Sequence, residues 1–453
     1  MTSAPAPRIA PGPRGLPLLG SVVPFRRDVL GLLLESRERF GDVVRFRLGP
    51  HVLHLVAHPD LIRQVLQERD EVYDKETRSS SKIRGMTGLG LLTASGELWR
   101  RQRRLIQPAF RPAAVAGFVE RMSEATAAML ERWERPAEPF DLASEMMRLT
   151  YTVVGRTLFS ADVSGDADEV EKAIAVLLAH TYRRLQRVVD PPEWLPTPGN
   201  RRYRQARATV DRVVYRILAE RRGRTTGDGE GNDLLSNLLR ERDEDTGRGM
   251  TDEQIRNETL TLLLAGHETT ANALTWTFYL LARHPEAMER LHDEAAAVLG
   301  GRAPSYEDLA RLPFAERVLR ESMRLYPPIW ALERRAVQDD ELGGHLIPAG
   351  STVVVSPWVT HRHPAFWNHP DGFDPDRFTE ERSEGRPPLA YLPFGAGPRF
   401  CVGTHFAMAE ALLVIAMIAS RWKPRLAPGH TVTPQPGITL RARNGVWVTL
   451  ERW

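Results

Sequence analysis

The sequence predicts a mainly α-helical protein with a minor β part, an α+β fold whose strands come from both ends of the chain. Apolar residues recur with helical spacing from about residue 97 to about residue 330. Short runs of β-branched residues lie before and after that stretch. One helix, expected over residues 251–283, is long enough to cross a whole domain.

The first strand-like runs are residues 43–48 and 51–56, which Gly49 and Pro50 join, so they predict a β-hairpin. The pattern becomes helical from Pro59. Strand signals return at residues 353–355 and again at 446–450. Because both ends of the chain contribute strands, we expect a single domain over residues 11–453. Residues 1–10, which are small or proline-rich, are expected to form a flexible tail.

The long helix has clear signals at both ends. Thr251, followed three residues later by Gln254, is typical of a capping box, and the His284–Pro285 pair ends the helix. A polar stretch over residues 222–249, interrupted by a short helix at 233–239, precedes it. Its middle reads AGHETT (residues 265–270). Glycine costs about 1 kcal/mol there and β-branched threonines are poor helix formers, so we expect a local distortion.

Composition narrows the class of protein. A chain of 453 residues with 42% hydrophobic residues can bury a large core, and a formal net charge of +3 gives no case for nucleic-acid binding. A single cysteine rules out an intramolecular disulfide and suits a reducing compartment. No stretch approaches the ~20 apolar residues of a membrane span, and Met1–Ala10 lacks the apolar core of a signal peptide. We therefore expect a cytoplasmic protein without a membrane anchor.

The single cysteine, Cys401, lies in the segment FGAGPRFCVG (residues 394–403). Glycines let a backbone approach a flat ligand closely, an arginine offers a fixed fork of donors to a carboxylate, and a thiol can become a thiolate ligand. Two other interpretations exist. Cys401 could be a buried small hydrophobe, or a nucleophile, although no histidine lies in the segment and His405 is the nearest.

The pattern F-x-x-G-x-R-x-C-x-G resembles the haem-ligand loop of the cytochrome P450 superfamily, and the resemblance extends from about Pro11 to the end of the chain. It implies a cytochrome P450 fold with the long central helix over haem b, and Cys401 as the axial ligand of the haem iron. It also implies a haem-thiolate monooxygenase that inserts one oxygen atom of O2 into a lipophilic small molecule.

The resemblance gives roles to residues of the long helix. Thr269 is the alcohol that hydrogen-bonds dioxygen, and Glu268 is the acid that helps to supply protons, in a groove that the expected distortion creates. Scission of the O–O bond needs two protons delivered without flooding the site with water. A threonine-rich patch that only packs against another helix is the simpler alternative. His267 is interpreted as structural or as lining the groove.

Two further motifs match the family. Glu321 and Arg324 match its E-x-x-R motif, although Glu97 and Arg100 have the same spacing. In the family this pair joins a later arginine, here Arg377, and the three have a structural role.

Haem contacts are carried over in the same way. Trp99 and Arg103 share one helical face. The resemblance assigns these two residues to a haem propionate, and Phe394 to the haem site. Arg334 and Arg399 resemble further propionate ligands, with Arg335 as the competing choice for the first.

The other basic residues of that helix, Arg100, Arg101 and Arg104, have two interpretations. They form either a solvated face or a docking patch for an acidic electron donor. Without a fused flavin or iron–sulfur module, we expect electrons from a ferredoxin or flavodoxin-type donor with its NAD(P)H reductase.

The substrate-contact regions of the family map to predominantly apolar residues of this chain, which favours a lipophilic substrate. The predicted pocket residues are Met86, Leu262, Ala265, Ile329, Trp330, Leu332 and Thr439. Fatty-acid hydroxylases of the superfamily hold a carboxylate with an arginine and a tyrosine, where this chain offers His51 and Leu55. We therefore favour a terpenoid or another hydrocarbon-like natural product as substrate.

Rival functions from other classes remain. A haem-thiolate peroxygenase or isomerase would not need the Glu268–Thr269 pair, and a haem-based sensor would need no groups that deliver protons. Turnover with NAD(P)H and surrogate redox partners separates these functions from a monooxygenase.

Overall fold

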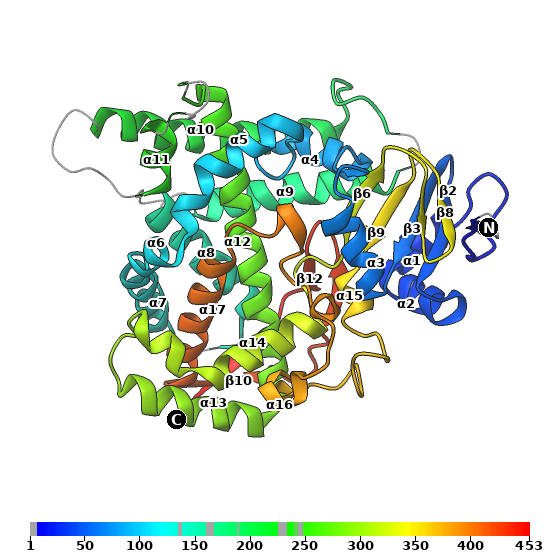
Figure 1. Ribbon diagram of the computed structural model, residues 1–453. Helices are drawn as coiled ribbons and strands as arrows, with labels where there is room; N and C mark the ends of the chain where they lie inside the picture. The colour runs from blue at the N-terminus through cyan, green and yellow to red at the C-terminus, as the bar shows by residue number, and fades with distance from the viewer. Residues whose placement is uncertain are drawn as a thin grey trace.

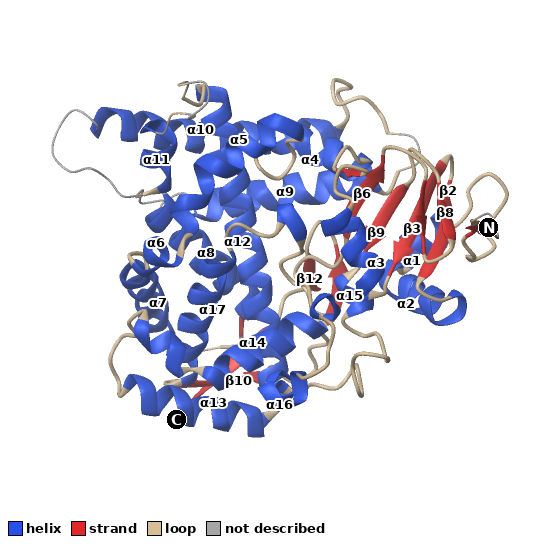
Figure 2. Cartoon of the chain, viewed as in Figure 1, coloured by secondary structure: helices blue, strands red, loops and turns tan. Residues whose placement is uncertain are grey.

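The structure is a computed structural model that describes residues 7–134, 138–159, 167–187, 190–224, 233–240, 242, 247 and 249–453. Helices make up most of it, and the largest sheet lies to one side of them (Figures 1 and 2). This arrangement confirms the predicted α+β class.

The helices differ widely in length, and α12 is the longest of those described. Their bounds are α1 Val22–Arg27, α2 Val29–Phe40, α3 Pro59–Arg63, α4 Arg78–Thr87, α5 Gly96–Ile106, α6 Pro112–Ala116, α7 Val119–Trp133, α8 Leu142–Leu158, α9 Ala167–Leu185, α10 Pro198–Arg224, α11 Leu234–Arg240, α12 Asp252–Arg283, α13 Pro285–Leu299, α14 Pro313–Leu325, α15 Pro357–Thr360, α16 Glu380–Ser383 and α17 Thr404–Ala419.

The strands form one five-stranded sheet in the order β2-β3-β9-β6-β4, two three-stranded sheets, β1-β8-β7 and β10-β13-β5, and the hairpin β11-β12. Their bounds are β1 Arg8–Ile9, β2 Val43–Leu48, β3 His51–Val56, β4 Tyr73–Asp74, β5 Phe140–Asp141, β6 Leu332–Ala336, β7 Asp340–Leu342, β8 His345–Ile347, β9 Thr352–Val355, β10 Trp422–Leu426, β11 Thr433–Pro436, β12 Leu440–Arg443 and β13 Trp447–Arg452.

Several elements lie where the sequence predicts them. The hairpin β2–β3 has the predicted bounds, and α11 and α12 match the short and the long helix expected around residues 233–283. The predicted capping box is present, because Thr251 and Gln254 each accept a backbone N–H of the other. Part of the segment expected to be a flexible tail, residues 7–10, is described. Residues 1–6 lie outside the described ranges, and Arg8 and Ile9 pair with β8, which supplies partners for their backbone groups.

Helix α12 runs through the helical part of the molecule and packs against α8, α14 and α17 (Figure 1). Most of its side chains are buried, which is expected of a helix covered on all sides. Two of its threonines, Thr275 and Thr277, are satisfied within the helix, because each donates to the carbonyl four residues earlier at 2.7 Å.

The expected distortion at residues 265–270 is not observed, because α12 is a continuous α-helix there. The Thr269 hydroxyl donates to the Ala265 carbonyl at 2.6 Å, as in an ordinary helix. Gly266 has another role. A Cβ at this position would lie 3.1 Å from a methyl group of Val154, so the missing side chain lets α8 pack closely on α12.

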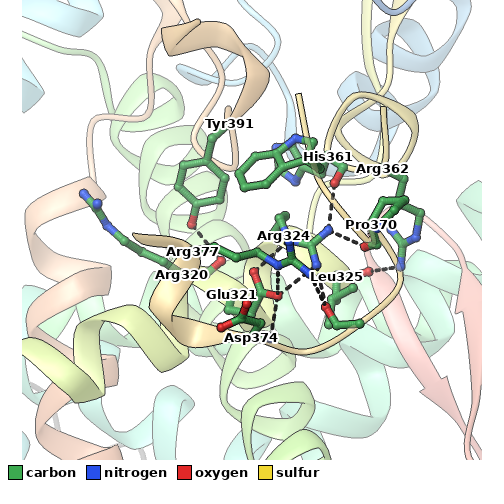
Figure 3. A network of polar contacts seen from close by, with 12 residues as sticks. Arg320, Glu321, Arg324, Leu325, His361, Arg362, Pro370, Asp374, Arg377 and Tyr391 are labelled. Atoms are coloured by element: carbon green, nitrogen blue, oxygen red, sulfur yellow. Dashed lines mark hydrogen bonds and ion pairs between the residues drawn. The ribbon is translucent and has the colours of Figure 1, made fainter. Parts of the chain in front are cut away.

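A buried ion network fixes α14 to the chain that follows it (Figure 3). Glu321 receives two hydrogen bonds from Arg324, at 2.7 and 2.8 Å, and one from Arg377 at 3.2 Å. The Asp374 amide donates to the same carboxylate at 2.9 Å. Arg324 also donates to the His361 carbonyl at 2.9 Å. Glu321 and Arg324 are fully buried, so the network is the structural unit that the E-x-x-R motif predicts.

Removing one charge from this network should destabilise the fold. Glu321→Gln leaves two buried guanidinium groups without a carboxylate, which costs about 3–5 kcal/mol. The free energy of unfolding in urea measures the loss. Glu316→Gln on the same helix is the matched control, because its partner Arg320 lies 3.0 Å away but both side chains are more than 40% exposed. The control should cost less than about 1 kcal/mol. Equal losses in the two variants would contradict this prediction.

Candidate active site

The segment around Cys401 is a tight loop that the polypeptide itself holds in shape. The Cys401 amide donates to the Phe394 carbonyl at 3.0 Å, and the Thr404 hydroxyl donates to the Cys401 carbonyl at 2.9 Å. Gly397 has a φ of 72°, and a Cβ there would collide with the Leu66 carbonyl. This glycine is therefore required for packing of the loop against its own chain.

The Cys401 thiol is surrounded by protein and is still accessible. Burial raises its pKa, an effect that the Gly403 amide, the Thr404 hydroxyl and the charge of Arg103 partly offset. Yet Cys401 is exposed. A ligand could therefore reach the sulfur.

One face of α12 is open in the same way. Ala265 is exposed and Thr269 is half-buried, although both lie in the middle of a largely buried helix. Their neighbours Leu264 and His267 are buried. Small side chains thus leave room beside α12, next to the Thr269 hydroxyl.

Three cations that lack ion-pair partners lie close to one another in this part of the molecule. Among the described residues, no salt bridge joins Lys75, Arg334 or Arg399 to a carboxylate. Burial, together with the charges of the two arginines, lowers the pKa of Lys75 to about 7. Burial lowers the pKa of Arg334 and of Arg399 to about 10, and for Arg399 the charge of Arg334 adds to the effect. Such a cluster fits a ligand with carboxylate groups.

Each of these three cations donates to a backbone carbonyl, and Arg334 donates to that of Glu333 at 2.9 Å. Lys75 donates to the Leu92 carbonyl at 3.0 Å, and Arg399 donates to the Ala94 carbonyl at 3.0 Å. The Arg399 guanidinium also lies 4.4 Å from the centre of the Trp99 ring. Trp99 and Arg399, both predicted haem contacts, are therefore neighbours.

The other predicted haem contacts are placed as follows. Arg103 donates to the Phe400 carbonyl at 2.9 Å, so it lies beside the Cys401 loop. Phe394 is half-buried against the main core. The two neighbouring arginines have different surroundings. Arg334 is 8% exposed, whereas Arg335 forms an ion pair with Asp74 at 2.5 Å. Among the described residues, Arg334 forms no ion pair with a carboxylate, whereas Arg335 does.

Glu268 is buried and tied to the C-terminal hairpin. Its carboxylate accepts a hydrogen bond from the Thr439 hydroxyl at 2.5 Å and forms an ion pair with Arg441 at 2.5 Å. Asn272, one turn further along α12, donates to the Thr439 hydroxyl at 3.1 Å. The acid next to Thr269 thus has a fixed position and a positively charged partner.

His267 is structural. It is 1% exposed, its ring lies 5.8 Å from that of Tyr151 in an edge-to-face contact, and burial lowers its pKa to about 3. A neutral imidazole between α8 and α12 follows from these facts.

A cavity of about 860 Å³ opens between α1–α2, α9 and the β11–β12 hairpin and reaches Glu268. Of the seven predicted pocket residues, only Thr439 lines it. Met86 and Leu262 belong to the main core, and Ala265 is exposed beside Thr269.

The remaining predicted pocket residues lie around the loops near the sheet. The Trp330 indole donates to the Gly437 carbonyl at 3.0 Å, and Leu332 lies next to Gly395 of the Cys401 loop. Ile329 is half-buried just before them.

The basic face of α5 is only partly as predicted. Arg104 is exposed, and Arg100 is exposed and paired with Glu97 at 2.5 Å. Arg101 is not an outward-facing charge, because it is half-buried and donates to the Gly249 carbonyl at 2.9 Å.

Sequence reasoning missed Lys75 and Arg441. Lys75 comes next to Arg334 because it directly follows β4, which pairs with β6, and no local pattern predicts that pairing. Arg441 alternates with apolar residues in a strand, but its partner Glu268 is 173 residues away. Both require the tertiary structure.

Comparisons with known proteins identify the family. The profile of the family described as Cytochrome P450 matches residues 10–446. The chain is a member of the cytochrome P450 family. It is 41% identical to the cyclooctatin synthase of Streptomyces melanosporofaciens, over 96% of this chain and 93% of that protein. It is 36% identical to the pentalenene oxygenase of Streptomyces avermitilis, over 93% and 92%.

A solved structure agrees. The crystal structure of the cytochrome P450DA haem domain superimposes with a TM-score of 0.89 at 28% identity, covering 99% of both chains. The protein is therefore a cytochrome P450 monooxygenase, and family and fold together imply a haem-thiolate cofactor, O2 as a substrate and redox partners. Within the described ranges, every helix is too short or too polar to cross a lipid bilayer.

Haem binding to this P450 should depend on pH through Lys75. A carboxylate beside the ammonium group raises its pKa again. From about pH 7 towards 10.5, the ordinary lysine value, Lys75 is neutral before binding and charged afterwards. Haem affinity should therefore fall as pH rises through this window, with uptake of a proton. Calorimetric titration of the apoprotein with haem in two buffers of different ionisation enthalpy measures this uptake.

Lys75→Met should abolish the uptake, and Lys423→Met, whose partner is the surface residue Glu289, should leave it unchanged. Proton uptake that persists in Lys75→Met would show that another group titrates.

The same calorimetric titration tests which of the two neighbouring arginines contacts the haem. Arg334→Gln should weaken haem binding more than Arg335→Gln.

Proposed function

We propose that this P450 uses haem b to oxidise a lipophilic, terpenoid-like small molecule. The observation that carries the proposal is the accessible Cys401 thiol near three cations that form no ion pair among the described residues. Cys401 would hold the iron, and Lys75, Arg334 and Arg399 would hold the propionates. When bound, the haem supplies the oxygen-activating chemistry of the family.

Proton supply is the task that we propose for the residues of α12. Glu268 is the buried acid at the inner end of a cavity, so it can exchange protons with water there and pass them towards Thr269. Arg441 and Thr439 hold the carboxylate in one orientation. The Thr269 hydroxyl already donates a hydrogen bond to the Ala265 carbonyl. The lone pairs of its Oγ1 can still accept a hydrogen bond from another donor.

The relatives support the substrate class. One more, from Streptomyces melanosporofaciens, is named cyclooctat-9-en-7-ol 5-monooxygenase and is 39% identical over 93% of this chain and 90% of that protein. By their names, it and the pentalenene oxygenase act on a cyclic alkenol and on an alkene. Apolar residues such as Leu34, Leu178 and Ile438 around the cavity suit a substrate of that kind.

Electrons would come from a separate ferredoxin or flavodoxin-type donor with its NAD(P)H reductase. The exposed Arg104, with Arg100 on the same helix, offers positive charge to an acidic donor, and Arg103 next to the Cys401 loop places that helix on the thiol side. Such rim charges act mostly on the rate of encounter.

The first test of the proposed function is thiolate ligation. The reduced protein with carbon monoxide should show the red-shifted Soret band of a thiolate-bound haem, and Cys401→His should convert it to the spectrum of imidazole ligation. An imidazole-type spectrum in the intact wild-type protein would refute the role of Cys401.

A second test separates the acid from the alcohol. Thr269→Ala should uncouple the enzyme, so that NAD(P)H is consumed and peroxide is released without product. Glu268→Gln should slow turnover roughly 100-fold, the scale of general acid catalysis, because it removes the proton donor. Arg441→Leu should slow turnover less, since Thr439 still holds the carboxylate.

The measurement is product formed per NAD(P)H oxidised, with the solvent isotope effect on turnover. Thr270→Val is the matched control, because the neighbouring Thr270 hydroxyl is buried without a hydrogen-bond partner among the described residues. Normal coupling in both Thr269→Ala and Glu268→Gln would contradict the assignment.

A further inference from the structure

The cavity that reaches Glu268 has walls from three parts of the chain. Helices α1 and α2 form one side, α9 forms the second, and the β11–β12 hairpin with its connecting residues forms the third. Its volume of about 860 Å³ lies in the upper part of the range of small-molecule sites.

The inner walls of the cavity are apolar. Leu30 and Leu34 lie one turn apart on α2, and Leu178 and Trp358 face them from α9 and α15. Leu30, Leu178 and Trp358 are each less than 9% exposed, so this part of the lining belongs to the packed interior. It suits a hydrocarbon skeleton.

Arginines stand at the cavity on all three sides. They are Arg26 and Arg27 of α1, Arg183 of α9, and Arg441 and Arg443 of β12. All of them except Arg441 are exposed, so they mark the solvent side of the cavity. Arg441 and Arg443 are two residues apart in a strand and therefore project from the same face of the hairpin.

Among the described residues, Arg441 is the one of these five arginines that pairs with a carboxylate. Two carboxylates line the cavity, and both are engaged: Asp28 accepts the Gly31 amide at 3.0 Å, and Glu268 pairs with Arg441. Within the described parts of the chain, Arg26, Arg27 and Arg443 have no hydrogen bond or ion pair. The cavity thus presents a surplus of positive charge beside an apolar interior.

We propose that this cavity binds an apolar substrate that carries a carboxylate, with the carboxylate at the arginines and the hydrocarbon body pointing inward to α12. The proposal rests on the proposed monooxygenase function and narrows its substrate class. Arginine forks match a carboxylate in two-point geometry. The exposed arginines keep the head group near solvent, while the apolar walls lead to Glu268, the residue before Thr269.

The β2–β3 hairpin lacks the arginine and tyrosine of the fatty-acid hydroxylases, but the arginines of the cavity supply positive charge elsewhere. His51 and Leu55 offer no carboxylate site there, since Leu55 is fully buried and neither residue lines the cavity. The positive charge comes instead from α1, α9 and β12, which no local motif predicts.

The test compares ligands that differ only in the head group. Farnesoic acid, farnesol and methyl farnesoate are titrated into the haem-loaded protein by calorimetry, at low salt and at physiological salt. The acid should bind roughly tenfold more tightly than the alcohol or the ester at low salt, and the difference should shrink at higher salt. Equal affinities for the three ligands would overturn the proposal.

The double variant Arg183→Ala/Arg443→Ala should lose roughly tenfold in affinity for the acid and less than twofold for the alcohol. Arg204→Ala is the matched control, because Arg204 is an exposed arginine of α10 that does not line the cavity. An equal loss for acid and alcohol would also overturn the proposal. Should the double variant not fold, the ligand comparison in the wild type decides alone.

Measuring binding and turnover distinguishes failure of the carboxylate site from failure of the proposed monooxygenase function. If the acid binds selectively but is not oxidised, the carboxylate site is supported and the proposed oxidation of such a molecule is rejected. Oxidation of the alcohol with no preference for the acid would leave the proposed function and reject the carboxylate site.

Discussion

The position of the Cys401 loop depends on one buried carboxylate, that of Glu321. Glu321 holds Arg324 within α14, and it binds Arg377 and the Asp374 amide in the segment that leads to the loop. The same helix reaches the chain just before the loop, because the Tyr391 hydroxyl donates to the Arg320 carbonyl at 3.1 Å. A helix of the core thus fixes two points of an irregular segment, which has few repeating hydrogen bonds of its own.

That fixed segment allows the site to carry charges that the protein does not neutralise. Lys75, Arg334 and Arg399 repel one another and are partly or largely buried, which costs stability unless an anion joins them. The fold tolerates the cost because the segments that bear these residues are held elsewhere: Arg334 lies in the five-stranded sheet, and Arg399 follows the glycine that packs against Leu66. Stability of the framework and affinity for an anionic cofactor are therefore linked through the same residues.

The sequence was most informative where one segment carries the whole signal. The hairpin β2–β3, the capped helix α12 and the Cys401 loop follow from local patterns, and the last of these led to the family. It was least informative where segments far apart must meet. The resemblance assigned Arg334 and left Arg335 open, and only the pairing of β4 with β6 shows that Arg335 is bound to Asp74. The distortion expected in α12 failed for a related reason: tertiary packing outweighs weak helix propensity, since Gly266 fits against Val154 and Thr269 bonds within the helix.

Arg441 contacts both the buried acid Glu268 and the arginine-lined cavity. On one side it pairs with Glu268, the buried acid of α12, and on the other it lines the cavity with Arg443. An anion held at the cavity adds negative potential next to Arg441 and competes with Glu268 for the same guanidinium. Because Thr439 keeps its own hydrogen bond to Glu268, the acid would stay in position while its ion pair weakened. Occupancy of the cavity and the orientation of Glu268 would thus be coupled by one side chain, Arg441.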